Sequence, residues 1–169
     1  AADLPARYDT PQFDNSAMDG YALAYPDGNG TRFTLTGRIA AGESTSLTLQ
    51  PGQAARIFTG APVPAGTTAV VAQEDVQTEG EAVVLTKPAP VGSHIRHRAE
   101  EYAAGGVLLP QGTLLDPAAV ALAASQGHAT LPVLRPLRVA VFSSGNELRE
   151  PGTELAPGQI FDANRYQML

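Results

Sequence analysis

Glycine and proline interrupt the middle of this chain so often that only short elements fit between them. Gly 17 and Pro 14 in 169 residues exceed average usage, which favours many turns and short strands over long helices. The runs with strand character are Phe33–Thr36, Ser46–Leu49, Thr67–Val71 and Ala82–Leu85. The turn signals around them are Gly28–Gly30, Pro51-Gly52, Pro64–Gly66 and Glu79-Gly80. We therefore expect a mainly β fold, with a compact barrel-like domain over residues 24–98.

The segments that flank this β domain have a different pattern. Residues 1–20 contain two prolines and no helical period, so we expect extended chain that is ordered only by lying on another segment. Residues 105–115 favour a hairpin about Pro110–Gly112. A helix is predicted from Pro117 to Ser125, with Asp116 as its N-cap and Gly127 just beyond its end. Residues 1–23 and 99–135 are thus predicted to form an extended linker domain with one helix.

The chain changes character after a short edge strand expected at Leu131–Leu134. Val139–Phe142 is a continuous apolar run, typical of a parallel strand that is covered on both faces. The loop Ser143–Glu147 would follow at the strand end, where open α/β sheets bind ligands. A helix is expected to start at Arg165, capped by Asp162–Asn164. One strand and a helix start do not complete a sheet, so we expect residues 136–169 to begin a truncated α/β domain.

Charge and composition exclude several classes of function. The net charge of −6 argues against binding to nucleic acid or to an acidic membrane, because both are polyanions. A small anionic substrate stays possible if local groups attract it. The chain has no cysteine, which excludes disulfides and thiolate metal sites and is compatible with the cytoplasm. No apolar run reaches the roughly 20 residues that span a bilayer, and no signal peptide opens the chain. We expect a soluble, cytoplasmic protein.

The run Asp14–Ala22 carries an unusual density of polar groups. It places two carboxylates, an amide and a hydroxyl beside a glycine and an aromatic residue. On residue types alone, an ordinary turn is the better interpretation. However, the apolar segment Tyr21–Leu23 that follows would hold the turn rigidly against a core. Asp19 could therefore be a carboxylate in a defined position.

A second candidate is the loop Ile57–Gly66. Its prolines push Ala61 and Val63 out of the helical region, so the loop is held extended. Thr59 could present a hydroxyl at the mouth of this loop, and Gly60 could open the backbone to a ligand. An ordinary rigid connection is the alternative.

The densest charge run of the chain is His94–Glu101. His94 and His97 lie three residues apart, but the lack of a third ligand nearby makes zinc improbable. A solvated charged face is the default interpretation. In the functional alternative, one arginine of the run, Arg96 or Arg98, meets an anion. Glu100 or Glu101 would then serve as a carboxylate for a cation or for orientation.

Taken together and in this order, four runs resemble the molybdopterin molybdenumtransferase family, which includes the bacterial MoeA proteins and the E domain of gephyrin. The runs are Asp14–Ala22, Arg56–Pro64, Ile95-Arg96 with Glu100-Glu101, and Phe142–Leu148 with Pro151-Gly152. The resemblance covers essentially the whole chain, but not the opening helices, most of the pterin-binding domain or the final β domain of the family. It implies insertion of molybdate into adenylylated molybdopterin with release of AMP. It also implies Mg²⁺ and a homodimer with its active site between subunits.

The resemblance also implies roles for individual residues. The implied catalytic residues are Asp19, Thr59, Glu101 and Glu147. The three carboxylates among them, Asp19, Glu101 and Glu147, would hold Mg²⁺, which prefers oxygen ligands. Contacts to the molybdopterin substrate are expected from Ser143, Ser144, Gly145 and Asn146.

The chain departs from the family pattern at four positions. Ala99 stands for Gly, Glu101 for Asp, Ser144 for Thr and Asn146 for Asp. The serine keeps the hydroxyl, whereas Asn146 loses a charge and Glu101 shifts a carboxylate. Because further family residues lie beyond Leu169, we expect this chain to be inactive alone and its full-length parent to be the enzyme. A scaffold module of the gephyrin type and a degenerate, non-catalytic paralogue are the alternatives, and the pattern fits molybdate and tungstate alike.

Overall fold

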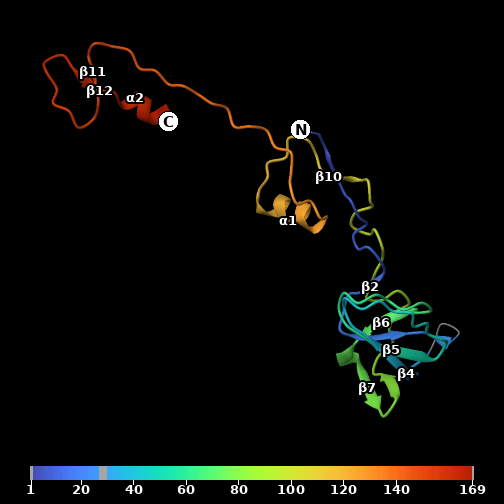
Figure 1. The fold of residues 1–169 in the computed structure, drawn as a ribbon. Coiled ribbons are helices and arrows are strands. Elements are labelled where there is room, and N and C mark those ends of the chain that lie inside the picture. The colour runs from blue at the N-terminus through green and yellow to red at the C-terminus, as the bar shows by residue number, and fades with distance from the viewer. Residues whose placement is uncertain (1, 27–29, 169) are drawn as a thin grey trace. The chain divides into compact units, whose positions relative to one another are not determined.

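The structure is a computed structural model that describes residues 2–26 and 30–168. It divides into two compact units, residues 1–131 and residues 132–169, each described here by itself. The predicted mainly β character is confirmed, since strands clearly outnumber helices (Figure 1). The turn predicted at Gly28–Gly30 falls mostly outside the described residues.

A curled, six-stranded sheet forms the body of the first unit, with strand order β6-β3-β5-β4-β8-β7 (Figure 1). Neighbouring strands are antiparallel except for β4 and β5, which are parallel. Its strands are β3 (Gly20–Leu23), β4 (Arg32–Ile39), β5 (Gln53–Ile57), β6 (Ala69–Ala72), β7 (Val76–Glu79) and β8 (Ala82–Leu85).

Strands β3, β5 and β6 of this sheet carry buried residues on both faces. Because side chains alternate along a strand, Ala22 packs with Ile57 and Val70 in one cluster, and Leu23 packs with Phe33 in the other. Alanine is frequent in both clusters, which lets the backbones and the two packed layers come close together. This double burial holds the amino end of β3 in a fixed place.

Two of the four predicted strands are confirmed in place, those at Phe33–Thr36 and Ala82–Leu85. The strand predicted at Thr67–Val71 lies two residues later, because the hydroxyls of Thr67 and Thr68 bond to Pro64 O and Leu23 O in a turn. The strand predicted at Ser46–Leu49 is wrong. Only Thr48 forms an isolated bridge there, with Ala65, while Leu49 inserts its side chain into the core.

Residues 2–16 are largely extended and pair in several places with the segment 95–109, as expected. Strand β1 (Leu4–Pro5) pairs with β10 (Val107–Leu109), and β2 (Asn15–Ser16) pairs with β9 (Ile95–Arg96). The hairpin predicted over 105–115 is therefore wrong. β10 takes its partner from the amino-terminal segment, and residues 113–115 form no strand.

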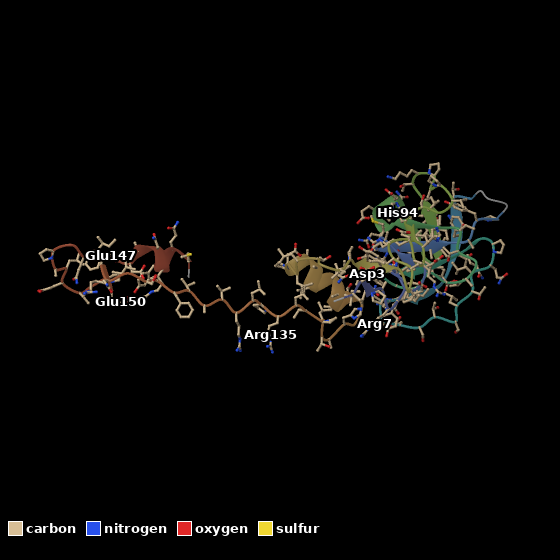
Figure 2. All side chains as sticks on the ribbon, turned by 90° about the horizontal axis from the view of Figure 1, so that it is seen from above. Asp3, Arg7, His94, Arg135, Glu147 and Glu150 are labelled. Carbon is tan, nitrogen blue, oxygen red and sulfur yellow. The ribbon has the colours of Figure 1, made fainter. Side chains whose placement is uncertain are left out.

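Helix α1 (Pro117–Ser125) matches the prediction at both ends. Asp116 accepts a hydrogen bond from Ala119 N at 2.7 Å, and Gly127 adopts the left-handed conformation, with φ of 73°. Gln126, only 2% exposed, anchors the helix to the amino-terminal segment. Its Oε1 accepts from the amides of residues 7 and 8, and its Nε2 donates to Thr10 Oγ1. Arg7 also bonds to Gly127 O, beside the helix (Figure 2).

The second unit contains a parallel pair, β11 (Leu148–Arg149) with β12 (Ile160–Phe161), and helix α2 (Ala163–Met168). The helix start near Arg165 is confirmed, and Asp162 Oδ1 accepts from Arg165 N at 3.2 Å.

The strands predicted at Leu131–Leu134 and Val139–Phe142 are absent from the described part of the second unit. Phe142 is 89% exposed. A buried parallel strand requires pairing partners and covered faces, and residues 132–168 provide neither for this run.

Neither α1 nor α2 has the length and apolar character to cross a membrane, and the described residues contain no other helix that does.

The position of Gly20 gives a test of the sheet. A Cβ atom on Gly20 would lie 1.7 Å from the carbonyl oxygen of Val71 on β6. We expect Gly20→Ala to force β3 and β6 apart and to lower the free energy of unfolding by about 3 kcal/mol or more, measured by urea denaturation. Gly37→Ala on β4 is the matched control, because its Cβ would meet only the flexible end of Leu47, at 3.1 Å. Equal losses for the two variants would contradict the explanation.

Candidate functional site

The structure brings Asp19 and Thr59 into direct contact. Gly20 of β3 is paired with Ile57 of β5, so the residues just outside these strand ends become neighbours. Thr59 N donates to Asp19 Oδ1 at 2.8 Å, and Thr59 Oγ1 donates to the same oxygen at 2.7 Å. Both side chains are exposed to solvent. Two segments separated by 40 residues thus form one small polar site.

A ring of further hydrogen bonds holds the backbone of this site. Gln73 N, in the 3-10 helix η2 (Gln73–Asp75), donates to Asp19 O at 3.0 Å. Arg56 Nη1 donates to Gly20 O at 2.8 Å, and Arg56 Nη2 donates to Gln73 Oε1 at 2.5 Å. Asp19 is therefore fixed through its main chain and through Oδ1. Its second oxygen, Oδ2, has no hydrogen bond to the part of the chain that the structure describes.

The contacts with Thr59 set the ionisation of Asp19. The backbone N–H of Thr59, then its hydroxyl, and then the charge of Arg56 lower the pKa of Asp19 below its usual range. The carboxylate is therefore ionised at neutral pH. It can accept a hydrogen bond from a ligand or attract a cation through Oδ2. Thr59, in turn, already donates both of its hydrogen bonds to Asp19.

Glu101 lies on a different segment from Asp19. Its amide donates to Thr10 O at 2.9 Å, and its side chain is exposed. Of the two adjacent glutamates, it is Glu100 that closes the charged loop, by accepting from His97 N at 2.7 Å. Glu101 is left with its carboxylate available, although no contact joins it to Asp19 within the described segments.

The carboxylates of the first unit do not make a magnesium site by themselves. No group of three or more His, Cys, Asp or Glu residues is arranged to hold a metal ion anywhere in residues 2–26 and 30–168. Mg²⁺ prefers an octahedral oxygen shell and keeps several waters, so it requires more than one isolated carboxylate. The residues present do not fit the implied ion without additional ligands.

Two other aspartates attach the charged loop to the amino-terminal segment. Asp14 accepts from Arg98 N at 2.8 Å and contacts His97 Nδ1 at 3.1 Å. Asp9 accepts from Arg98 Nε at 2.5 Å and from Ala104 N at 2.8 Å. These contacts lower the pKa values of both aspartates. The main cause is the backbone N–H of Ala104 for Asp9 and the backbone N–H of Arg98 for Asp14. The anion that Arg98 meets in this structure is thus the carboxylate of Asp9.

Ala99 occupies a backbone conformation that favours glycine. Its φ is 62°, in the left-handed region, and its amide donates to Pro11 O at 3.0 Å. A side chain with a Cβ atom is strained there. The turn that places Glu101 therefore forms at an energetic cost in this chain.

In the second unit, the loop Ser143–Glu147 is exposed and is folded back on itself (Figure 2). The carboxylate of Glu147 lies over Gly145, where an added Cβ would be 2.5 Å from both of its oxygens. A hydrogen bond from the Ser143 side chain is the main cause of the lowered pKa of Asp162. Ser144, Asn146 and their neighbours keep exposed side chains, so this loop has the small, accessible character that the sequence indicates.

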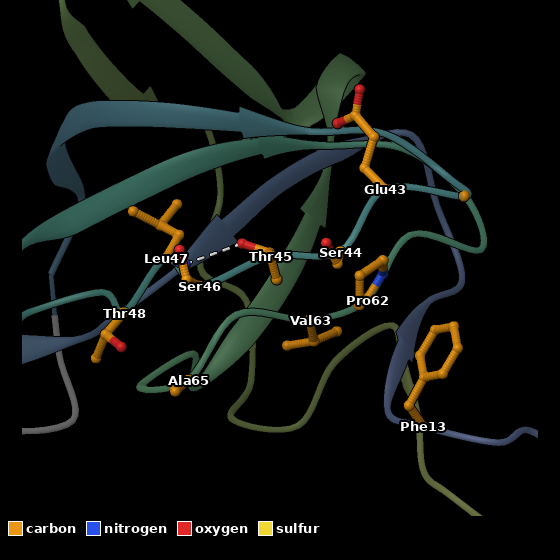
Figure 3. Close-up of a pocket in the computed structure, with 11 residues that line it drawn as sticks. Phe13, Glu43, Ser44, Thr45, Ser46, Leu47, Thr48, Pro62, Val63 and Ala65 are labelled. Atoms are coloured by element: carbon orange, nitrogen blue, oxygen red, sulfur yellow. Dashed lines mark hydrogen bonds between the residues drawn. The ribbon is translucent and has the colours of Figure 1, made fainter.

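A groove of about 650 Å³ lies beside the loop that follows Thr59 (Figure 3). One wall is the extended stretch Pro62–Ala65 together with Phe13, and the other is the irregular segment 42–48. Four hydroxyl-bearing residues of that segment line the groove, and one of them, Thr45, accepts a hydrogen bond from Leu47 N at 3.0 Å. Residues 46–48 line this groove instead of forming the strand that the sequence predicts there.

Sequence reasoning missed the supporting residues of the site. Arg56 stands in a run that was singled out for Thr59, and Gln73 follows a strand without any motif. Their roles depend on the pairing of β3 with β5 and β6, which no local pattern shows. The one local sign of a supporting role for Arg56 was its spacing of two residues from Phe58, which places both side chains on the same side of an extended segment.

The comparisons with known proteins agree on one family. Residues 1–127 match the family model of the MoeA N-terminal region (domain I and II). The molybdopterin molybdenumtransferase 2 of Mycobacterium tuberculosis is 45% identical over 98% of this chain and 42% of its own length. A molybdopterin molybdenumtransferase from Nostoc is 43% identical over 99% of this chain and 40% of its own length. This chain therefore spans about two fifths of the length of these curated relatives.

Solved structures give the same result. The crystal structure of the molybdopterin biosynthesis MoeA protein from Pyrococcus horikoshii superposes with a TM-score of 0.90 and 31% identity. It covers 99% of this chain and 46% of the Pyrococcus chain.

The lowered aspartate pKa values predict a dependence of stability on pH. A folded pKa below the unfolded value stabilises the protein fully above the unfolded pKa, and this stabilisation is lost as the pH falls through the folded pKa. We therefore expect the free energy of unfolding to decline below about pH 4. In urea titrations, Asp14→Asn should make that decline shallower. Glu79→Gln, at the exposed pair with Arg32, is the control. An unchanged acid profile in the Asp14 variant would contradict the role of that carboxylate.

The conformation of Ala99 predicts a stabilising substitution. Ala99→Gly removes the Cβ strain at φ of 62° and should raise the free energy of unfolding by roughly 1 kcal/mol. Ala103→Gly, on the same segment at a residue without positive φ, should instead lower it by about 0.5 kcal/mol. Thermal melts of both variants measure the difference. A loss of stability in both would show that Ala99 is not strained.

Proposed function

Because the chain belongs to the family of the MoeA N-terminal region, we propose that it forms the amino-terminal part of a molybdopterin molybdenumtransferase. Such an enzyme inserts molybdate into adenylylated molybdopterin and releases AMP. The single observation that carries the proposal to specific residues is the contact of Asp19 with Thr59. The names of the curated relatives support the reaction class.

In this proposal, Asp19 is the residue that meets the substrate. Its lowered pKa keeps the carboxylate ionised. Its second oxygen, Oδ2, accepts no hydrogen bond from the described residues, and the side chain is exposed to solvent. Thr59, Arg56 and Gln73 hold it in one orientation. A carboxylate fixed in this way loses little freedom when it orients a substrate hydroxyl or a water molecule. Thr59 acts by positioning Asp19 and does not itself donate a hydrogen bond to the substrate.

Apart from Glu101, the other residues of the proposed site belong to the second unit. Glu147 and the loop Ser143–Asn146 would contribute substrate contacts from the α/β domain. In a homodimer with the site between subunits, the domain that faces Asp19 belongs to the partner copy. Glu101 extends from a different segment, so any Mg²⁺ would depend on ligands from beyond the first unit, including substrate phosphates. A cytoplasmic location is part of the same proposal.

A chimera tests the proposed function. This chain would replace the matching amino-terminal part of the Mycobacterium tuberculosis relative, and molybdate insertion would be measured with adenylylated molybdopterin. We expect turnover from the chimera and none from the 169-residue chain alone, because the chain covers only 42% of the relative. Asp19→Asn in the chimera should lower turnover by about 100-fold while the melting temperature is kept.

Glu79→Gln is the matched control in the chimera, since it makes the same chemical change at an exposed ion pair with Arg32. It should leave turnover unchanged. Full activity of the Asp19 variant would remove Asp19 from the site. A folded but inactive chimera would favour the degenerate paralogue, and turnover by the chain alone would contradict the expected inactivity of the fragment.

A further inference from the structure

A row of arginine and aromatic side chains crosses the sheet next to Asp19. Arg38 of β4 is in register with Arg56 of β5, and Arg56 is in register with Tyr21 of β3. Residues paired in this way project from the same face of a sheet. The guanidinium carbons of Arg38 and Arg56 each lie 4.8 Å from the ring centre of Phe58, and that of Arg56 lies 5.1 Å from the Tyr21 ring.

Neither positive charge of this row is neutralised by a direct ion pair in the described residues, although the charge of Arg56 also acts on Asp19. Neither Arg38 nor Arg56 takes part in an ion pair within the described segments, although the chain has a net charge of −6. Like charges at paired positions destabilise a sheet. Cation–π contacts with Phe58 and Tyr21 offset part of this repulsion, but they leave the positive potential in place. Two guanidinium groups beside a single carboxylate leave a net positive charge, which is suited to an external anion.

The two arginines would contribute to anion binding in different ways, Arg56 through its charge and Arg38 through its hydrogen-bond donors. Arg56 is half-buried and directs Nη1 and Nη2 to Gly20 O and Gln73 Oε1, so it contributes charge at a fixed position. Arg38 is exposed and donates no hydrogen bond to the part of the chain described by the structure. Its planar guanidinium can therefore bind two oxygens of a tetrahedral oxyanion at once.

The neighbouring site of Asp19 and Thr59 does not offer free hydrogen-bond donors to an oxyanion. The amide and the hydroxyl of Thr59 are both directed to Asp19 Oδ1, so an oxyanion would have to displace the carboxylate to use them. Asp19 also repels an anion. Two guanidinium groups outweigh that one carboxylate, and they lie on the same strands, β4 and β5, that lead to the site.

We propose that Arg38 and Arg56 form an oxyanion-binding row that takes a tetrahedral dianion, of the class of phosphate monoesters and molybdate, beside Asp19. Arg38 makes the direct contact, and Arg56 supplies charge and holds Gly20. The choice of ligand class rests on the proposed function, whereas the binding row itself rests on the cross-strand register and on the lack of an ion pair to either arginine among the described residues. The phosphate of AMP and molybdate are both tetrahedral dianions, so the test titrates each of them separately.

The test is a titration of the 169-residue chain at low ionic strength. AMP, sodium molybdate and sodium sulfate are added separately, and the arginine Nε–H and backbone amide signals are followed by NMR. We expect the Arg38 signal to shift with a saturable curve. Preference for AMP would identify a nucleotide phosphate, preference for molybdate would identify the metal oxyanion, and equal binding of all three would show that the row recognises the dianion alone.

Variants assign the binding to Arg38. Arg38→Ala should weaken binding by about tenfold, the amount expected for one charge-assisted hydrogen-bonding group. Arg32→Ala is the matched control, because Arg32 lies on the same strand but pairs with Glu79, and it should leave binding unchanged. Arg56→Lys keeps the charge with less risk to the fold and should weaken binding less than Arg38→Ala.

Two outcomes would overturn the proposal. One is the absence of any saturable shift at Arg38 with all three anions. The other is equal weakening by the Arg38 and Arg32 variants, which would indicate general charge attraction. Binding is measured here without turnover, so its failure is distinct from a failure of the chimera to insert molybdate.

Discussion

The close approach of β3 to β6 at Gly20 is the constraint on which the site depends. A Cβ atom at this position would overlap the carbonyl oxygen of Val71, so only glycine lets the two strands pair there. Because β3 is also paired with β5 and buried on both faces, its amino end has no freedom to move. Asp19 is the next residue outward. Its position beside Thr59 therefore follows from backbone packing in the sheet rather than from the flexibility of a surface turn.

The aspartates of the first unit divide into two kinds by what they contact. Asp9 and Asp14 satisfy backbone amides and an arginine of the charged loop, and so attach residues 97–104 to the amino-terminal segment. Asp19 uses one oxygen for Thr59 and leaves the other open. All three have lowered pKa values through hydrogen bonds to their charged forms. The lowered pKa alone does not distinguish the site from its supports, whereas the unused oxygen does.

In the proposed function, the first unit supplies one part of a reaction centre. It offers the ionised carboxylate of Asp19 with one oxygen unused, and beside it two arginines that form no ion pair in the described residues, but no cluster of metal ligands there. This is the composition expected for one wall of a site that is completed by another domain. The local charge of the row is opposite to the net charge of −6, which is what the proposed binding of an anion by an acidic chain requires. The chain spans about two fifths of its curated relatives, which is consistent with a partial site.

What the sequence determined by itself is local. Helix α1 was predictable to the residue because Asp116, Pro117 and Gly127 act within one turn of its ends, and the β character followed from short runs between glycines and prolines. Only tertiary structure decided which segments pair. β10 joins β1 instead of a hairpin partner, residues 46–48 line a groove instead of forming a strand, and the apolar run 139–142 stays unpaired. Arg38 and Arg56 became a pair through strand register alone. Pairing depends on partners distant in the chain, and a local pattern carries no information about them.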